Sequence, residues 1–213
     1  WLLVVVWVCG TDVYFDKDFV AEGRKKLLEM FPEIGNRKII LYSPTFRGNS
    51  IAASYMKNMF DMERMYEEFS KDYVFVVKHH PLTVKAFRFS NEQKKKYDGF
   101  IFDITKTVDI DTALCAADLV ISDYSSLVFE YALLERPMIF FAFDLENYYD
   151  ARSFYYEYED FVPGEIVRNS DEVIAEIKRL ETDFDIERVR IFKNRFMSAC
   201  NGNSIEQIME KVL

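Results

Sequence analysis

Short apolar runs alternate along the chain with longer segments in which apolar residues recur every three or four positions. The apolar runs are continuous and rich in β-branched and aromatic residues, which is typical of parallel strands buried on both faces. They predict strands at Lys38–Tyr42, Tyr73–Lys78, Phe100–Phe102, Leu119–Ile121 and Met138–Ala142.

The segments between these runs have the period of amphipathic helices. They predict helices at Asp16–Met30, Ser50–Ser70, Asp109–Ala117 and Leu127–Glu135, and further helices from Ser170 onward, interrupted near Asp183 and near Asn201–Gly202. Asn91–Lys96 is polar and basic, and we expect it to be solvated surface. Strands and helices that alternate in this way predict an α/β fold: a parallel-sheet, Rossmann-like domain with helices on both faces.

The chain begins with an apolar run, Trp1–Cys9, which we expect to form a β-strand that ends at Gly10-Thr11-Asp12. The run is too short to span a bilayer as a helix, and no basic segment precedes it as in a secretory signal. We therefore interpret residues 1–12 as a strand and junction from a missing N-terminal domain, and residues 13–213 as the nucleotide-binding domain.

Composition narrows the function classes. The net charge of −9 argues against unspecific binding to nucleic acid or to an anionic bilayer. The 3 cysteines lie far apart, which fits a reducing cytosol and indicates neither a disulfide scaffold nor a zinc site.

The side chains that could bind a ligand or take part in catalysis follow the predicted strands. In parallel α/β sheets, ligands bind outside the carboxyl ends of the strands. The loops in question are Ser43–Gly48, His79–Pro81, Ser122–Ser126 and Asp144–Asp160. Their convergence on one edge is stronger support for a binding site than any one of them.

The loop Ser122–Ser126 lies between a predicted strand and a predicted helix, where free backbone N–H groups favour an anion. We expect this loop to hold phosphate through its backbone and its polar side chains, which are Ser122, Asp123, Tyr124, Ser125 and Ser126. The alternative is that Asp123 or Ser125 only caps the helix, and no glycine-rich phosphate fingerprint occurs in the chain.

His79 and His80 are the 2 histidines of the chain, and both lie in one strand-exit loop. A histidine there can neutralise a phosphate or protonate a leaving group, whereas metal binding is disfavoured because no cysteine accompanies the pair. Arg47 can bind an anion or form a surface ion pair, and Arg152 can contact phosphate or stack on the aromatic residues around it.

An ordered series of short motifs resembles one known family. The series begins with four short motifs: Ser43-Pro44-Thr45-Phe46-Arg47, His80-Pro81, Ser122-Asp123-Tyr124-Ser125-Ser126 and Phe129-Glu130-Tyr131. It continues with Pro137, Phe140, Asp144, Tyr148, Arg152 and Pro163-Gly164. This order is similar to that of the CDP-glycerol glycerophosphotransferases, the teichoic-acid primases and polymerases. The resemblance implies one half of a GT-B architecture, the C-terminal, donor-nucleotide domain.

The resemblance also implies roles for single residues. His80 would be the catalytic residue and contact the donor phosphates, Glu130 would meet the ribose, and Arg152 would hold the diphosphate, with Thr45 and Arg47 in a further substrate-binding loop. No metal or cofactor is expected. The chain departs from the family pattern at the junction, where Pro-Arg is missing before Asp12, and at Glu130, where aspartate is common.

The implied reaction transfers glycerol phosphate, or another polyol phosphate, from a CDP donor to an acceptor hydroxyl bound by the missing domain. Its implied place is the cytoplasm, with the longer protein peripheral at the membrane. Two alternatives stay open: the donor domain of a GT-B nucleotide-sugar glycosyltransferase, and a non-catalytic nucleotide-binding or assembly domain.

Overall fold

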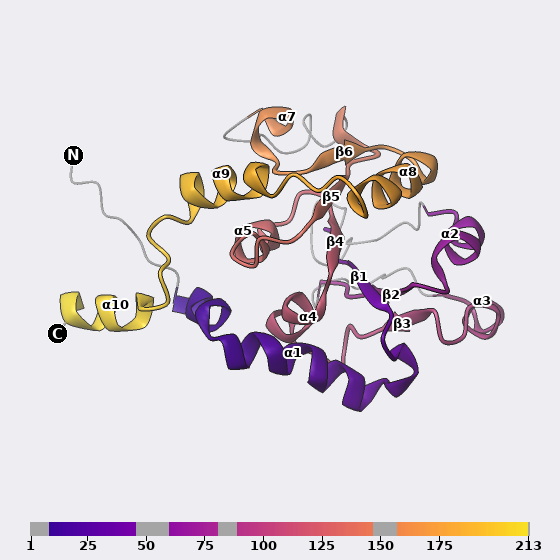
Figure 1. Ribbon diagram of the computed structural model, residues 1–213, viewed down its shortest axis with the longest axis horizontal. Coiled ribbons are helices and arrows are strands. Elements are labelled where there is room, and N and C mark those ends of the chain that lie inside the picture. The colour runs from indigo at the N-terminus through magenta and orange to yellow at the C-terminus, as the bar shows by residue number, and fades with distance from the viewer. Residues whose placement is uncertain (1–8, 46–59, 81–88, 147–156, 213) are drawn as a thin grey trace, which may run out of the picture.

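The computed structural model describes residues 9–45, 60–80, 89–146 and 157–212 and contains a parallel sheet (Figure 1). Its 6 strands follow the order β3-β2-β1-β4-β5-β6, and every neighbouring pair is parallel. The strands are β1 (Lys38–Tyr42), β2 (Tyr73–Val77), β3 (Ile101–Asp103), β4 (Leu119–Ser122), β5 (Met138–Phe141) and β6 (Glu165–Val167). This order is that of a Rossmann-like fold, so the predicted fold class is confirmed.

Helices cover both faces of the sheet (Figure 1). One face packs against α1 (Lys17–Met30), α4 (Ile110–Ala116), α5 (Leu127–Ala132), α7 (Tyr158–Phe161) and α9 (Ile186–Phe196). The other face packs against α2 (Met62–Phe69), α8 (Ser170–Leu180) and the segment after α3 (Asn91–Lys96). The remaining elements are the 3-10 helices η1 (Cys9–Phe15) and η2 (Pro32–Ile34) and the C-terminal α10 (Ser204–Val212).

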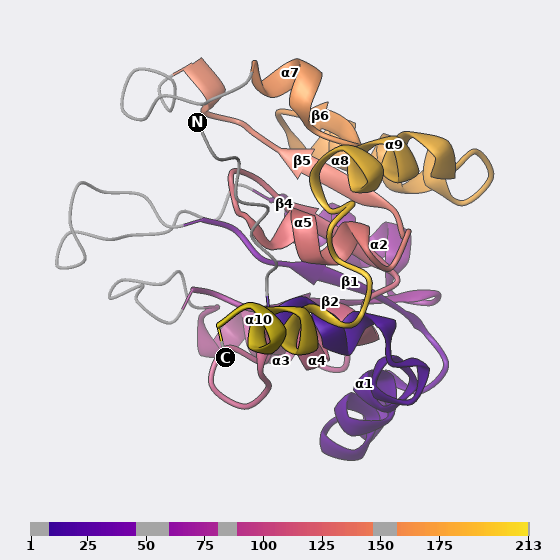
Figure 2. The same cartoon turned by 90° about the vertical axis from the view of Figure 1, so that its left-hand side faces the viewer.

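The strand order places the topological switch point between β1 and β4. From β1 the chain continues outward on one side to β2 and β3, and from β4 on the other side to β5 and β6. The carboxyl ends of all strands lie at one edge of the sheet because the pairs are parallel (Figure 2). The exit loops of β1, β2 and β4 are therefore neighbours, as the sequence predicted.

Aspartate side chains cap the N-termini of α1 and α4. The Asp16 carboxylate accepts hydrogen bonds from the backbone of the first turn of α1, and the Asp109 carboxylate accepts one from Thr112 N at 2.7 Å in α4. Each cap satisfies N–H groups that have no partner inside the helix. Asp109, the first residue of the helix predicted over Asp109–Ala117, is thus the N-cap of α4.

The predicted helix over Ser50–Ser70 is not continuous, because Phe60 and Asp61 are not helical. Residues 50–59 lie outside the described part, and α2 starts at Met62. Asp61 caps it by accepting a hydrogen bond from Arg64 N at 3.2 Å, while Phe60 packs edge-on against Tyr42 with ring centroids 4.7 Å apart. A capping aspartate and a core aromatic residue therefore replace the helical turn that periodicity suggested.

The helix predicted to end at Glu135 ends at Ala132 instead. Glu135 has φ 53°, in the left-handed region, and its carboxylate pairs with Arg190 at 2.7 Å and with Lys193. These contacts with α9 hold Glu135 in a conformation that would otherwise be unfavourable. Pro137 also disfavours helical geometry at the residue before it.

Asn91–Lys96 is exposed as predicted, but it is also helical. Ser90 and Gln93 form a capping box in which the Ser90 side chain accepts from Gln93 N at 3.1 Å and Gln93 Oε1 accepts from Ser90 N at 3.0 Å. This reciprocal pair explains a helix in a segment without an apolar face.

The expected strand at Trp1–Cys9 lies outside the described residues except for Cys9, which begins η1 rather than ending a strand. The Asp12 carboxylate accepts hydrogen bonds from Ser204 N at 2.9 Å and from Ile205 N at 3.0 Å. It thereby caps α10, which lies beside η1 and away from the sheet (Figure 1).

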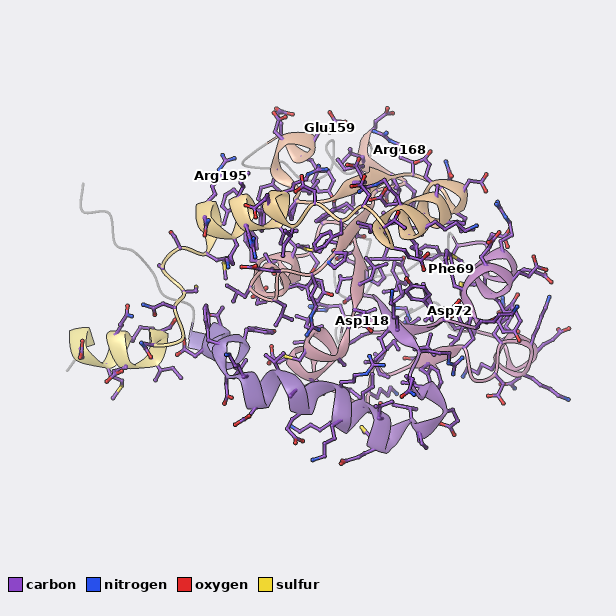
Figure 3. The ribbon with its side chains drawn as sticks, in the orientation of Figure 1. Phe69, Asp72, Asp118, Glu159, Arg168 and Arg195 are labelled. Atoms are coloured by element: carbon purple, nitrogen blue, oxygen red, sulfur yellow. The ribbon has the colours of Figure 1, made fainter. Side chains whose placement is uncertain are left out.

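Charged side chains lie on the outer faces of the helices and in the loops (Figure 3). Arg168 and Glu159, for example, form an exposed ion pair at 3.7 Å near the outer edge of the sheet. Such pairs contribute little to stability. Within the described ranges, no helix is long and apolar enough to cross a bilayer.

Candidate donor-binding site

A cavity of about 700 Å³ opens at the carboxyl edge of the sheet, across the switch point. The loops after β1, β2 and β4 form its walls together with α4, α5 and Tyr14 of η1. The lining residues are Tyr14, Ser43, Pro44, Thr45, Lys78, His79, His80, Asp109, Ile110, Asp111, Leu114, Tyr124, Ser125, Ser126, Leu127 and Glu130.

Buried side chains join the strand ends behind this cavity. Ser122 Oγ, at the end of β4, donates to Ser43 O at 3.0 Å, and Ser43 Oγ donates to Lys78 O at 3.1 Å. Lys78 Nζ in turn donates to Val108 O at 2.5 Å, in the segment before α4. This chain of contacts crosses β4, β1 and β2, so it fixes the relative positions of the exit loops.

Asp123 links the exits of β1 and β4. It is 4% exposed, and its Oδ1 accepts from Thr45 N at 2.8 Å and from Tyr124 N at 2.7 Å. The Tyr158 hydroxyl donates to Asp123 O at 2.7 Å. These contacts give the carboxylate a positioning role, because two loops that line the cavity are held by one side chain.

The loop before α5 presents hydroxyl groups to the cavity. Ser125 and Ser126 both line it, and Ser126 occupies the cap position of α5 without a side-chain capping bond. The Tyr124 hydroxyl donates to Asp144 Oδ1 at 3.0 Å. The α5 helix has 6 residues, so its dipole is short and hydroxyl or N–H donors must supply most of the attraction for an anion.

The histidines differ in exposure although both line the cavity. His79 is 5% exposed, and its backbone N–H donates to Thr105 Oγ1 at 3.1 Å, whereas the His80 side chain is exposed. This difference follows from the alternation of successive side chains in extended backbone. His80 is accessible to a ligand in the cavity.

Carboxyl groups form the opposite wall. The Tyr14 hydroxyl donates to Asp111 Oδ1 at 2.6 Å. The pKa of Tyr14 is raised, mainly by burial and secondly by this hydrogen bond. Burial, together with the charge of Asp111, also raises the pKa of Glu130. Among the described residues Glu130 Oε2 has no hydrogen-bond partner, which makes it available to a ligand hydroxyl or amine.

We predict that the stability of Glu130→Gln relative to wild type increases as pH rises from 4 to neutral. A raised folded-state pKa means that Glu130 favours the folded state below the unfolded pKa and that this contribution is lost as pH rises through the folded value. The amide removes the titration, so the difference in melting temperature between variant and wild type should grow with pH. A pH-independent difference, measured by thermal unfolding between pH 4 and 8, would contradict the assignment.

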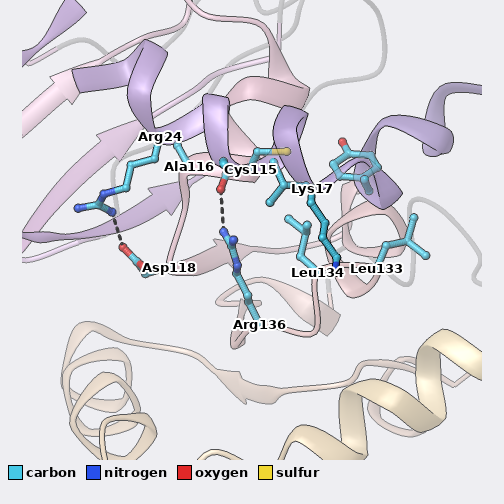
Figure 4. Close-up of a pocket in the computed structure, with 11 residues that line it drawn as sticks. Lys17, Arg24, Cys115, Ala116, Asp118, Leu133, Leu134 and Arg136 are labelled. Atoms are coloured by element: carbon cyan, nitrogen blue, oxygen red, sulfur yellow. Dashed lines mark hydrogen bonds and ion pairs between the residues drawn. The ribbon is translucent and has the colours of Figure 1, made fainter. Parts of the chain in front are cut away.

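A second cavity of about 480 Å³ lies between α1, the end of α4 and the turn after α5 (Figure 4). Its two arginines have internal partners: Arg24 pairs with Asp118 at 3.0 Å, and Arg136 donates to Cys115 O and Ala117 O, each at 2.7 Å. Because these bonds satisfy the end of α4 and the start of β4, the cavity has a structural explanation.

The structure brings together most of the predicted site residues that it describes. Six of them line the larger cavity: Thr45, His80, Tyr124, Ser125, Ser126 and Glu130. The side chains of Ser122 and Asp123 lie behind its wall and are bonded to backbone groups. Arg47 and Arg152 lie outside the described residues.

Sequence reasoning missed Tyr14, Lys78, Asp109 and Asp111 as lining residues. Only Lys78 carried a usable signal, a charged residue at the end of an otherwise apolar strand. Within the described ranges, no three histidine, cysteine or carboxylate side chains are grouped as a metal site would require.

Comparisons with known proteins agree with this geometry. Residues 9–213 match the family described as CDP-glycerol:poly(glycerophosphate) glycerophosphotransferase. The chain is 34% identical over 212 residues to the teichoic acid poly(ribitol-phosphate) polymerase of Bacillus spizizenii, covering 99% of this chain and 33% of that protein. It is 31% identical over 207 residues to the teichoic acid glycerol-phosphate primase of Bacillus subtilis, covering 97% of this chain and 50% of that protein.

Solved structures of the wall teichoic acid polymerase TagF share the fold. A histidine-to-asparagine variant superimposes with a TM-score of 0.79 at 26% identity, covering 96% of this chain and 50% of that one. The same kind of variant soaked with CDPG gives a TM-score of 0.74 at 27% identity, with coverage of 93% and 46%. The chain thus spans about half of these polymerase chains. Sequence and structure together show that the chain belongs to the CDP-glycerol:poly(glycerophosphate) glycerophosphotransferase family.

Proposed function

We propose that this chain is the donor-binding part of a polyol-phosphate transferase and that it holds a CDP-linked polyol in the cavity at the carboxyl edge. The observation that carries the proposal is the composition of the cavity walls. Histidine and serine side chains come from the exits of β2 and β4, whereas Asp109, Asp111 and Glu130 come from α4 and α5. A nucleoside diphosphate has matching parts, with an anionic diphosphate and a neutral ribose and base that donate hydrogen bonds.

In this arrangement His80, Ser125 and Ser126 bind the diphosphate, and Glu130 accepts a hydrogen bond from the ribose. Arg47 and Arg152 are further phosphate contacts on the strength of the family resemblance. Asp123 and Ser122 act on the ligand indirectly, because their side chains hold the exits of β1 and β4 together.

The proposed reaction is in-line phosphoryl transfer. An acceptor hydroxyl attacks the phosphorus that carries the polyol and gives up its proton to a base outside this chain. A new P–O bond forms, the bond to the bridging oxygen breaks, and CMP leaves. His80 is the proposed catalytic residue of this chain, because an imidazolium beside the bridging oxygen neutralises the charge that develops on CMP.

The polyol is glycerol or ribitol in this proposal. Relatives of both kinds match the chain, at 34% identity for the poly(ribitol-phosphate) polymerase of Bacillus spizizenii and 32% for its poly(glycerol phosphate) polymerase. The acceptor, a polyol phosphate, would bind to the part of such proteins that this chain does not span. We place the activity in the cytoplasm, with the longer protein at the membrane face, on the strength of family membership.

We predict that CDP stabilises the 213-residue chain against heat more than UDP or GDP does. A ligand present at a hundred times its dissociation constant adds roughly 2.7 kcal/mol to the free energy of unfolding. Thermal unfolding with each nucleotide measures this directly. A larger shift with UDP would favour a nucleotide-sugar glycosyltransferase, and no shift with any nucleotide would favour a binding or assembly role unrelated to nucleotides.

A further inference from the structure

Lys78 is a buried cation in the wall of the larger cavity, and neither the sequence motifs nor the catalytic scheme uses it. It follows the last residue of β2 and precedes His79 and His80 in the same exit loop. The residue is 7% exposed, yet it lines the cavity.

The buried ammonium group is incompletely compensated. Its hydrogen bond to an acceptor in the described part of the chain is the contact with Val108 O at 2.5 Å, and an ammonium group has three N–H donors. Burial lowers the pKa of Lys78, although the charges of Asp109 and Asp103 act in the opposite direction. Desolvation thus outweighs the attraction of the neighbouring carboxylates, so an anion in the cavity would relieve the cost of burying this charge.

We propose that Lys78 is a donor-binding residue whose ammonium group contacts an oxygen of the donor's diphosphate. This inference rests on the proposed function, which it extends by a phosphate-binding residue at the end of β2. The same ammonium group also donates to Val108 O, in the segment before α4. No metal ion is needed for Lys78 to act in this way, because the cation is part of the wall.

The position explains why a lysine is suited to the task. Its backbone carbonyl already accepts the Ser43 hydroxyl, so the start of the side chain is fixed relative to β1. A long side chain that is anchored at its base and buried along its length loses little further conformational freedom when a ligand arrives. The contact is therefore preorganised.

The experiment compares Lys78→Met with wild type by titration calorimetry, using cytidine, CMP and CDP. Methionine preserves the length and apolar body of the side chain but removes the charge. We expect CDP to bind roughly 10- to 100-fold more weakly to the variant, the range for one hydrogen bond to a charged group. Cytidine, which has no phosphate, should bind within a factor of about two of wild type, since RT ln 2 is below 0.5 kcal/mol.

A merely structural role gives a different pattern. If Lys78 only holds Val108 in place, Lys78→Met should lose affinity equally for cytidine and for CDP, and this result would overturn the inference. Unchanged CDP affinity would overturn it as well. Failure of wild type to bind CDP would instead overturn the proposed function and the inference together.

Controls keep the result interpretable. Lys38→Met makes the same replacement at the exposed start of β1, at the opposite edge of the sheet, and should leave CDP binding unchanged. If Lys78→Met does not fold, Lys78→Arg keeps the charge with different geometry. A selective loss of CDP affinity relative to cytidine in Lys78→Arg supports the contact, whereas affinities equal to those of wild type for both ligands contradict it.

Discussion

Replacing Asp123 with alanine is expected to lower the free energy of unfolding by roughly 3–5 kcal/mol, because two partly buried N–H groups lose a buried carboxylate acceptor. The carboxylate is 4% exposed and accepts from Thr45 N at 2.8 Å and Tyr124 N at 2.7 Å. Alanine leaves both N–H groups without this partner and frees the β1 exit from the β4 exit. Chemical denaturation measures the loss.

Asp123→Asn is the matched control, because its amide oxygen can still accept from both N–H groups. We expect it to retain most of the stability that alanine loses. If alanine and asparagine were both as stable as wild type but failed to bind CDP, Asp123 would be a ligand contact rather than the link between the loops.

Replacing His80 with alanine is expected to weaken CDP binding by roughly 1.5–3 kcal/mol, the range for a hydrogen bond to a charged group. Its exposed side chain lines the cavity, so the change should leave the melting temperature of the free chain nearly unchanged. His79→Ala should act in the opposite way, with a larger loss of stability and a smaller loss of affinity, since His79 is 5% exposed.

Titration calorimetry with CDP on both variants tests this prediction. Equal, small losses of affinity for His80→Ala and His79→Ala would show that the phosphate binds elsewhere.

The arrangement of the sheet was predictable because its strands are continuous apolar runs. Val74 and Phe75, for example, are almost completely buried on opposite faces, so no polar position interrupts the pattern. Helix ends were less predictable because side chains set them. Asp61 caps α2 and interrupts the predicted helix, and the ion pairs of Glu135 with α9 stabilise a left-handed turn after α5.

The site was predictable at the level of loops but only partly at the level of side chains. Parallel strands bring their exits together whatever the details, which placed Thr45, His80 and Ser125 at one cavity. Ser122 has the same chemistry as Ser125, yet its hydroxyl donates to Ser43 O just after β1, whereas Ser125 Oγ accepts from Leu127 N at 3.4 Å. Only the packing of β4 beside β1 separates the two serines, and a sequence does not contain that packing explicitly.

The central claim is that the donor's diphosphate occupies the cavity between the exits of β1, β2 and β4. A crystal structure of the chain with bound CDP tests it most directly. We predict diphosphate oxygens within hydrogen-bond distance of His80 and of Ser125 or Ser126, with the ribose beside Glu130. A nucleotide bound in the cavity between α1 and α4, or elsewhere on the surface, would contradict it.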